Sequence, residues 1–230
     1  MNKGQITDIF FDLDHTLWDF DRNSKLAFER IFEQRKIPLA LSDFMKVYEP
    51  INFQYWKQYR EERISKQELR RGRFKDAFAP FGISFPIEVL DEISLDYIAE
   101  LPKDNYLFDG TIELLEYLTQ KNYNLHIITN GFDEVQYVKL KKSKIDFYFN
   151  TVTTSEDVGV KKPNPKVFKH ALSLANVQAS ASVMIGDTFE ADILGAESVG
   201  MHTLFFNYRN EKVPDNYRVV DAVSEIKLHF

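Results

Sequence analysis

A short apolar run, residues 9–11, stops abruptly at two carboxylates, Asp12 and Asp14. Such a run near the start of a chain is typical of a buried strand in a parallel sheet. Side chains at i and i+2 share a face of a strand, so we expect both acids at its carboxyl end, where open α/β sheets bind ligands. Neither acid has a Lys or Arg nearby in the chain, so a cation or a shared proton must relieve their repulsion. The pattern predicts a hard-metal site with one carboxylate free for chemistry. The alternative is a plain turn after the strand.

The composition sets the limits of this interpretation. A chain of 230 residues with 44% apolar and 14% aromatic residues predicts one large domain or a core with a smaller partner. The net charge of −6 argues against a nucleic-acid partner. Cysteine is absent, which excludes disulfides and thiolate ligands. No apolar run approaches the roughly 20 residues that cross a bilayer, so we expect a cytoplasmic protein without a membrane partner; the oligomeric state is not predicted.

A long helical region follows the acid pair, over about residues 21–101. Apolar residues recur near helical spacing, and prolines separate the segments. Ser42 and the Ser65–Glu68 pair both have the form of a helix start, the second as a capping box. The region predicts a compact insertion of four or five helices.

Strands and helices alternate in the rest of the chain. A helix carrying Val135, Val138 and Leu140 follows the second strand, and Asn164 precedes Pro165 as an N-cap before another helix. This alternation predicts an α/β fold with a Rossmann-like parallel sheet and right-handed crossovers. The strands are expected at residues 125–129, 149–154 (weaker), 182–185 and, as the last strand, 202–206.

Polar residues lie at or beyond the carboxyl ends of these strands, and all are expected to converge on one crevice. Thr129 offers a hydroxyl, and Asn130 with the following glycine offers backbone N–H groups to an oxyanion, although Thr-Asn-Gly is also a plain turn sequence. Lys162 is either a partner for carboxylates or phosphate, or a solvated surface lysine. Asp187 ends a strand as Asp12 does, and Asp192 lies early in a helix, where it also favours the helix dipole.

Four short polar motifs therefore occur in a fixed order. They are Asp12-x-Asp14-x-Thr16, Thr129, Lys162-Pro163 and Gly186-Asp187-x-x-x-x-Asp192. This set resembles the four motifs of the haloacid dehalogenase superfamily and covers essentially the whole chain. The helical region resembles the C1-type cap of that superfamily. The resemblance implies an α/β core, residues 1–17 and 104–230, and a helical cap, residues 18–103, which offers a way to exclude water. Too few residues separate the second and third motifs to hold the other common cap.

The resemblance also implies roles for the motif residues. Asp12 is expected to be the nucleophile that forms an aspartyl-phosphate. Asp14 resembles the general acid and base, with its main-chain carbonyl on Mg²⁺. Thr129, Asn130 and Lys162 are expected to hold phosphoryl oxygens. The expected metal ligands are Asp12, Asp14 and Asp187. Thr16 and Asp192 are expected in support, with Asp192 either near the metal or bracing Lys162.

Asp14 favours phosphatase chemistry, because the name-giving dehalogenases lack a second aspartate there and need no metal. Four stretches resemble the bacterial YjjG-type pyrimidine 5′-nucleotidases, which implies a small phosphomonoester substrate such as UMP, dUMP or dTMP. Phosphatases of sugar phosphates, a mutase and a non-catalytic binding module remain open as alternatives. The four stretches are residues 12–20, 72–74, 128–132 and 158–164.

Three residues are candidates for substrate specificity. Trp18 and Phe20 follow the acid pair closely, where they either stack on a base or pack between core and cap. Arg73 follows Gly72 inside a helical segment, and a glycine there often marks a bend or a close approach. Arg73 is expected either to reach into the crevice toward the substrate or to belong to a surface charge cluster.

Overall fold

The computed structural model describes residues 6–230 and divides into two compact units. The sheet unit comprises the chain up to Phe20 together with Asn105–Phe230, and the helical unit comprises Asp21–Asp104. Within the sheet unit, the segments that lead to and from the helical unit run antiparallel, with a bridge between Trp18 and Leu107. Across residues 6–230, no helix combines the length and the apolar character needed to cross a membrane.

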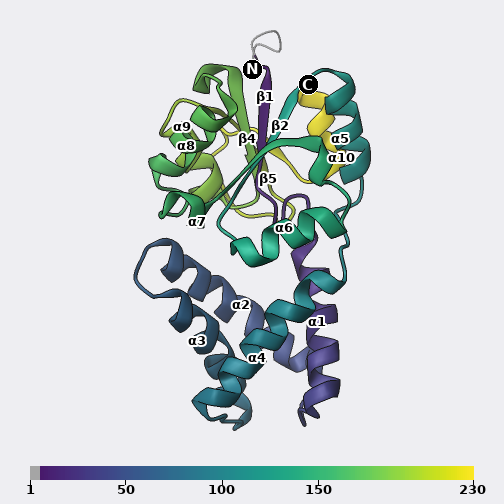
Figure 1. Ribbon diagram of the computed structural model, residues 1–230, viewed down its shortest axis with the longest axis vertical. Coiled ribbons are helices and arrows are strands. Elements are labelled where there is room, and N and C mark those ends of the chain that lie inside the picture. Colours follow the sequence, from purple (N-terminus) through teal and green to yellow (C-terminus); the bar gives the residue numbers. More distant parts are fainter. Residues whose placement is uncertain (1–5) are drawn as a thin grey trace. The chain divides into compact units, whose positions relative to one another are not determined.

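A six-stranded parallel sheet forms the centre of the sheet unit, and its strand order is β3-β2-β1-β4-β5-β6 (Figure 1). The alternating pattern therefore correctly predicted a parallel α/β fold. The apolar run after the N-terminus becomes the central strand β1, flanked on both sides, which explains why it is apolar on both faces. The strands are β1 Asp8–Phe11, β2 Asn124–Thr129, β3 Phe149–Thr154, β4 Ser182–Gly186, β5 His202–Phe206 and β6 Val219–Val220.

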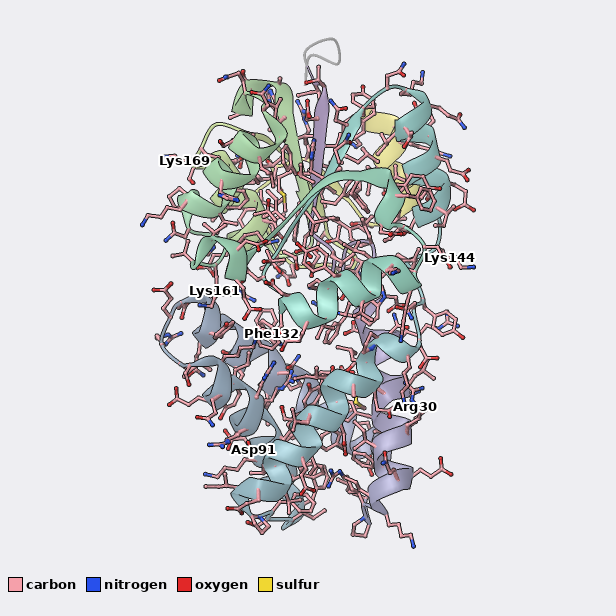
Figure 2. All side chains as sticks on the ribbon, in the orientation of Figure 1. Arg30, Asp91, Phe132, Lys144, Lys161 and Lys169 are labelled. Atoms are coloured by element: carbon pink, nitrogen blue, oxygen red, sulfur yellow. The ribbon has the colours of Figure 1, made fainter. Side chains whose placement is uncertain are left out.

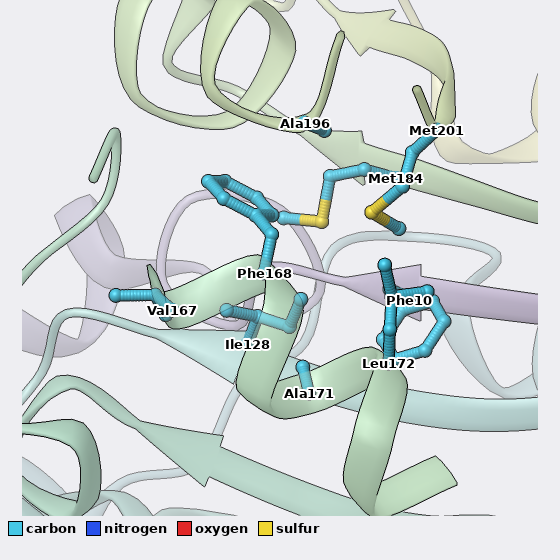
Figure 3. Close-up of a cluster of buried hydrophobic side chains, with 9 residues drawn as sticks. All are labelled: Phe10, Ile128, Val167, Phe168, Ala171, Leu172, Met184, Ala196 and Met201. Carbon is cyan, nitrogen blue, oxygen red and sulfur yellow. The ribbon is translucent and has the colours of Figure 1, made fainter. Parts of the chain in front are cut away.

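Helices cover both faces of this sheet, with α8 and α9 on one side and α5 and α10 on the other (Figure 1). The first face packs on Phe10, Ile128 and Met184, all fully buried (Figure 3). Phe168 and Leu172 of α8 lie one helical turn apart and meet these side chains, while Lys169 of α8 is exposed (Figure 2). The helices are α5 Thr111–Gln120, α6 Asp133–Lys142, α7 Ser155–Val158, α8 Pro165–Ala175, α9 Gly195–Glu197 and α10 Val223–Ile226.

Local sequence signals set several of these boundaries. The Asn164 side chain accepts a hydrogen bond from the backbone N–H of Lys166, so the predicted N-cap of α8 is confirmed. One expectation was wrong, and another is refined by the structure. His202–Phe206 is not the last strand, because the two-residue strand Val219–Val220 pairs with it, too short to leave a pattern. The segment after Asp187 begins as a π-helical stretch, Phe189–Leu194, before α9.

The helical unit contains four α-helices and two short 3₁₀ turns. Aromatic side chains fill its interior: Phe28 of α1 stacks on Tyr97 of α4 at 4.8 Å between ring centroids and meets Phe44 and Tyr48 of α2 edge-on. On its outside, Arg30 of α1 binds Glu100 at 2.7 Å (Figure 2). The elements are α1 Phe20–Arg35, α2 Leu41–Arg60, α3 Lys66–Phe78, α4 Ile87–Glu100 and the turns Ala79–Phe81 and Leu101–Lys103.

The two predicted helix starts in this unit had different outcomes. The capping box of Ser65 and Glu68 is present at the start of α3. The expectation for Ser42 was wrong, since α2 begins one residue earlier and Ala40 is its N-cap, without a side-chain hydrogen bond. Gly72 marks a close approach, as predicted, because a Cβ there would lie 2.3 Å from the ring of Tyr55 on α2.

Candidate active site at the carboxyl edge of the sheet

Asp12 continues β1 by one residue and lies at the carboxyl edge of the sheet, where its backbone N–H donates to Ile185 of β4 at 2.9 Å. The side chain is 10% exposed and accepts a hydrogen bond from Lys162 Nζ at 2.6 Å. Burial raises the pKa of Asp12 to about 7, with Asp192 and Asp14 adding to the shift and Lys162 opposing it. A carboxylate in this place has negative neighbours and one strong cationic partner.

Lys162 is buried, so the alternative of a solvated surface lysine is wrong. Its ammonium donates to Asp12 and to the Ile128 carbonyl at 2.7 Å, and it pairs with Asp192 at 2.7 Å. Burial alone would lower the pKa of Lys162, but Asp12 and Asp192 raise it above its usual value. Asn130 fixes the backbone of Lys162 by a reciprocal pair of hydrogen bonds at 3.0 and 2.8 Å. The lysine is thus a buried ammonium held in one place by Asp12, Asp192 and the Ile128 carbonyl.

Three buried carboxylates form a cluster beside this lysine. One oxygen each of Asp12, Asp187 and Asp192 lie within 4.8 Å of one another. Gly186 makes room for Asp192, since a Cβ at Gly186 would lie 2.3 Å from its carboxylate. Burial, followed by the charges of Asp12 and Asp192, raises the pKa of Asp187 well above its usual range. Asp192 also accepts from the backbone N–H of Thr188 at 3.0 Å, at the start of the π-helical stretch.

The side chain of Asp14 is not part of this cluster. Its carboxylate accepts from Lys139 Nζ at 2.5 Å and from Gln136 Nε2 at 2.9 Å. Gln136 Nε2 also lies 2.8 Å from the hydroxyl of Thr129, which accepts from the backbone N–H of Gly131 at 3.1 Å. Thr129 is thereby placed next to Asp14, as the convergence of strand ends predicted.

Lys139 and Gln136 were missed in the sequence. Their helix was predicted from Val135, Val138 and Leu140. In the structure Val138 is exposed, and the buried stripe comprises Val135, Gln136, Lys139 and Leu140. The signal was present: a glutamine and a lysine three residues apart lie on the same face as two buried apolar residues. Neither acid has a cationic partner nearby in the chain, as the sequence shows, but each has a lysine from far along the chain.

The turn after Asp14 has two further features. His15 adopts a left-handed backbone with φ of 66°, and its ring lies 2.8 Å from the Tyr208 hydroxyl and 2.9 Å from Arg209. Arg209 lies 3.6 Å from the buried Asp187 and is itself partly exposed. Thr16 is fully buried, and its hydroxyl has no hydrogen-bond partner within residues 6–230.

The candidate specificity residues are not placed at an open surface. Trp18 is fully buried, and Phe20 is 8% exposed. The Lys139 ammonium lies 4.2 Å from the Trp18 ring centroid and 5.3 Å from that of Phe20. One face of the Trp18 ring is thus occupied by a cation of the same unit. Base stacking on Trp18 has no support in this arrangement, in which the ring packs instead.

Arg73 lies inside the helical unit and is 2% exposed, so it is not part of a surface charge cluster. Its guanidinium donates to Asn52 at 3.0 Å and lies over the rings of Phe74 and Tyr97 at 4.8 and 4.9 Å. The neighbouring Arg71 forms the surface ion pair, with Asp91 on α4 (Figure 2). In this structure the Arg73 side chain stays among the residues of its own unit.

The carboxylate cluster fits a divalent metal ion. Oxygen ligands are what Mg²⁺ prefers, and three buried carboxylates against Lys162 and Arg209 leave negative charge that a cation would neutralise. The raised pKa values of Asp12 and Asp187 show that burial and mutual repulsion disfavour their charged forms. The predicted ligands Asp12 and Asp187 are together, and Asp192 joins them.

Comparison with known proteins gives the family. The model of the haloacid dehalogenase-like hydrolases matches residues 9–206. The chain is 33% identical over 219 residues to the pyrimidine 5′-nucleotidase YjjG of Escherichia coli, covering 95% of this chain and 93% of that protein. It is also 33% identical over 200 residues to a glyceraldehyde 3-phosphate phosphatase of Pyrococcus abyssi, covering 87% of this chain and 81% of that protein.

A solved structure of another hydrolase has a similar fold. The putative hydrolase YfnB of Bacillus subtilis, bound to magnesium, superposes with a TM-score of 0.88 at 27% identity and covers 98% of each chain. The fold and the site at its carboxyl edge therefore define an enzyme, a hydrolase. This chain belongs to the haloacid dehalogenase-like hydrolases, which confirms the resemblance predicted from the four motifs.

Proposed function

We propose that the protein is a Mg²⁺-dependent phosphomonoesterase that acts through an aspartyl-phosphate on Asp12. The observation that carries the proposal is the placement of Asp12 at the carboxyl edge of the sheet, 2.6 Å from a buried lysine and within a cluster of carboxylates. A phosphoryl group in transfer carries negative charge on three oxygens. Its transfer depends on positioning the reactants and on stabilising that charge. Lys162 supplies that charge beside the nucleophile.

In the proposed reaction, an oxygen of Asp12 attacks phosphorus while the bond to the leaving oxygen breaks. Asp14 gives its proton to the leaving oxygen. A water molecule then attacks phosphorus, the bond to Asp12 breaks, and the water proton goes to Asp14. Lys162 and the Thr129 hydroxyl, with Asn130 fixing the lysine loop, hold the phosphoryl oxygens. Dividing the hydrolysis into two displacements at one phosphorus makes each step easier than direct attack.

Asp12 and Asp187 would hold the metal, with the Asp14 carbonyl completing the protein ligands and Asp192 bracing Lys162. The ion would supply positive charge that allows the carboxylate of Asp12 and a phosphate to approach each other. This assignment is supported by the carboxylate cluster of this chain and by the magnesium bound to YfnB.

We further propose that the substrates are nucleoside 5′-monophosphates with pyrimidine bases, such as UMP, dUMP and dTMP. Support comes from the similarity to YjjG over nearly the full length of both chains. The second candidate is a small sugar phosphate, favoured by the equally identical glyceraldehyde 3-phosphate phosphatase. A non-catalytic module is disfavoured because the nucleophile, the lysine and the carboxylates are all in place.

The test is phosphate release from UMP, dUMP, dTMP, AMP, glyceraldehyde 3-phosphate, a hexose phosphate and a phosphonate. Each is assayed with Mg²⁺ and with a chelator, with Asp12→Asn as the blank. Metal-dependent release concentrated on pyrimidine nucleotides is the expected result. A preference for the sugar phosphates would support the proposed mechanism but refute pyrimidine nucleotides as the substrates. No metal-dependent release from the folded protein would refute the proposed function.

A further inference from the structure

Both carboxylate oxygens of Asp14 are bound by side chains of a single helix. Lys139 Nζ lies 2.5 Å from Oδ1, and Gln136 Nε2 lies 2.9 Å from Oδ2. The same amide group reaches the Thr129 hydroxyl at 2.8 Å. Gln136 and Lys139 therefore tie the acid of the first motif to the hydroxyl of the second, and both are buried, at 0% and 2% exposure.

The sequence around α6 is arranged to allow these contacts. Gln136 and Lys139 are three residues apart, so their side chains lie on one face, one turn of the helix apart. Gly131 leaves the space that the glutamine occupies, since a Cβ there would lie 1.6 Å from Gln136 Nε2. The glycine after Thr129-Asn130 is therefore a steric requirement for the glutamine, in addition to any role in the turn.

Lys139 is held in place by its surroundings. Burial lowers its pKa below the usual value, although Asp14 opposes the shift. The rings of Trp18 and Phe20 lie 4.2 and 5.3 Å from its ammonium, where they stabilise the cation and limit its movement. The buried Trp18 thus acts on the site through the lysine.

We propose that Gln136 and Lys139 are positioning residues that hold the Asp14 carboxylate for the second half of the reaction, in which Asp14 accepts a proton from water. This inference rests on the proposed function. Both contacts come from donors, and an ionised carboxylate accepts at both oxygens. Each oxygen has two lone pairs, so one on each remains for the water proton after the two contacts are made. The pair therefore orients Asp14 without blocking it.

The consequence is a defect confined to one step. The substrate p-nitrophenyl phosphate has a leaving group that departs without an acid, so breakdown of the aspartyl-phosphate limits its turnover. Lys139→Met is expected to lower kcat and KM together, each by roughly tenfold or more, and to leave kcat/KM within about threefold, because kcat/KM reports the steps up to release of nitrophenolate. A burst of about one nitrophenolate per active site is expected in the first turnover.

Three companion variants complete the experiment. Lys139→Arg keeps a donor and a charge and is expected to restore most of kcat. Gln136→Met removes the other donor, and it tests the same proposal with Lys139 intact if Lys139→Met fails to fold. Lys142→Met, at an exposed position of the same helix, is the matched control and is expected to behave as wild type.

A loss of kcat/KM as large as the loss of kcat, without a burst and without rescue by arginine, would overturn the proposal. Unchanged kcat in both Lys139→Met and Gln136→Met would also overturn it. An inactive wild type is a separate outcome, which would refute the proposed function and this inference with it. Circular dichroism and thermal unfolding of each variant confirm that a folded enzyme is being compared.

Discussion

The central strand carries an acid at each end, and the two acids have different surroundings. Asp8 begins β1, where its carboxylate lies 2.9 Å from His126 Nε2 and accepts from the Thr7 hydroxyl at 2.6 Å. His126 Nδ1 lies 2.8 Å from the Thr151 hydroxyl. A neutral imidazole fits both contacts, with Nε2–H donating to Asp8 and Nδ1 accepting from Thr151. The Asp8 carboxylate thus accepts from His126 on β2 and from Thr7 before β1, and Thr151 on β3 completes the network through His126.

The carboxyl end has an excess of negative charge. Asp12 shares Lys162 with Asp192, and Asp187 has Arg209 at 3.6 Å as its nearest cation. Burial raises the pKa of both Asp12 and Asp187, and their mutual repulsion adds to it. Both ends contain buried polar groups of similar types. The difference is that the residues of the amino end satisfy one another's hydrogen bonds, as in a structural network, whereas the crowded carboxylates of the carboxyl end leave a place for a further cation and a substrate.

Asp12→Asn gives the largest expected effect. Activity falls by at least ~10³-fold, because the amide cannot replace the carboxylate nucleophile. In chelator, the free energy of unfolding at pH 8 rises by roughly 1–3 kcal/mol, because one of three crowded buried charges is removed. Phosphate release and urea unfolding measure the two. A variant that is as active as wild type, or much less stable, would contradict the contrast between the two ends.

Asp8→Asn is the matched change at the amino end, with the opposite outcome. The amide has one acceptor oxygen in place of two, so either the Nε2–H of His126 or the Thr7 hydroxyl loses its acceptor. The free energy of unfolding is expected to fall by about 1–3 kcal/mol. Activity at a temperature well below the unfolding transition stays within about twofold. Urea unfolding gives the stability and initial rates give the activity, and both are measured on one preparation. A large loss of turnover with unchanged stability would show that the amino end also serves the reaction.

The smallest expected effect is a pH dependence of stability from His126. Burial lowers its pKa in the folded state, with Asp8 opposing, so the unfolded chain binds a proton more readily. This contribution to stability is therefore lost as the pH falls below about 6.5. Asp12 and Asp187 have raised pKa values, so their contribution to stability increases as the pH falls. To separate the effect of His126 from theirs, the stability of wild type is compared with that of His126→Gln by urea unfolding at pH 5.5 and 7.5. The difference in free energy of unfolding between the two proteins should shrink at the lower pH. A constant difference would refute the predicted contribution of His126.

Local signals predicted much of the fold, since strands, capping residues and strand-end polar residues each depend on a few neighbours in the chain. The apolar run before Asp12 and the N-cap Asn164 are examples. The partners of the acids were not predictable in this way, because Lys139 and Lys162 lie 125 and 150 residues from the carboxylates they bind. A lysine is usually solvated, and only the folded sheet unit buries these two.

The central claim is that Asp12 becomes phosphorylated during turnover. The direct test is to quench the enzyme in acid during turnover of p-nitrophenyl phosphate, reduce the protein with borohydride, and sequence its peptides by mass spectrometry. An aspartyl-phosphate is reduced to homoserine, whereas a free carboxylate is not. Homoserine at position 12, absent from an enzyme quenched without substrate, is the predicted result. Turnover with Asp12 unmodified, or with homoserine at position 14 in its place, would contradict the account.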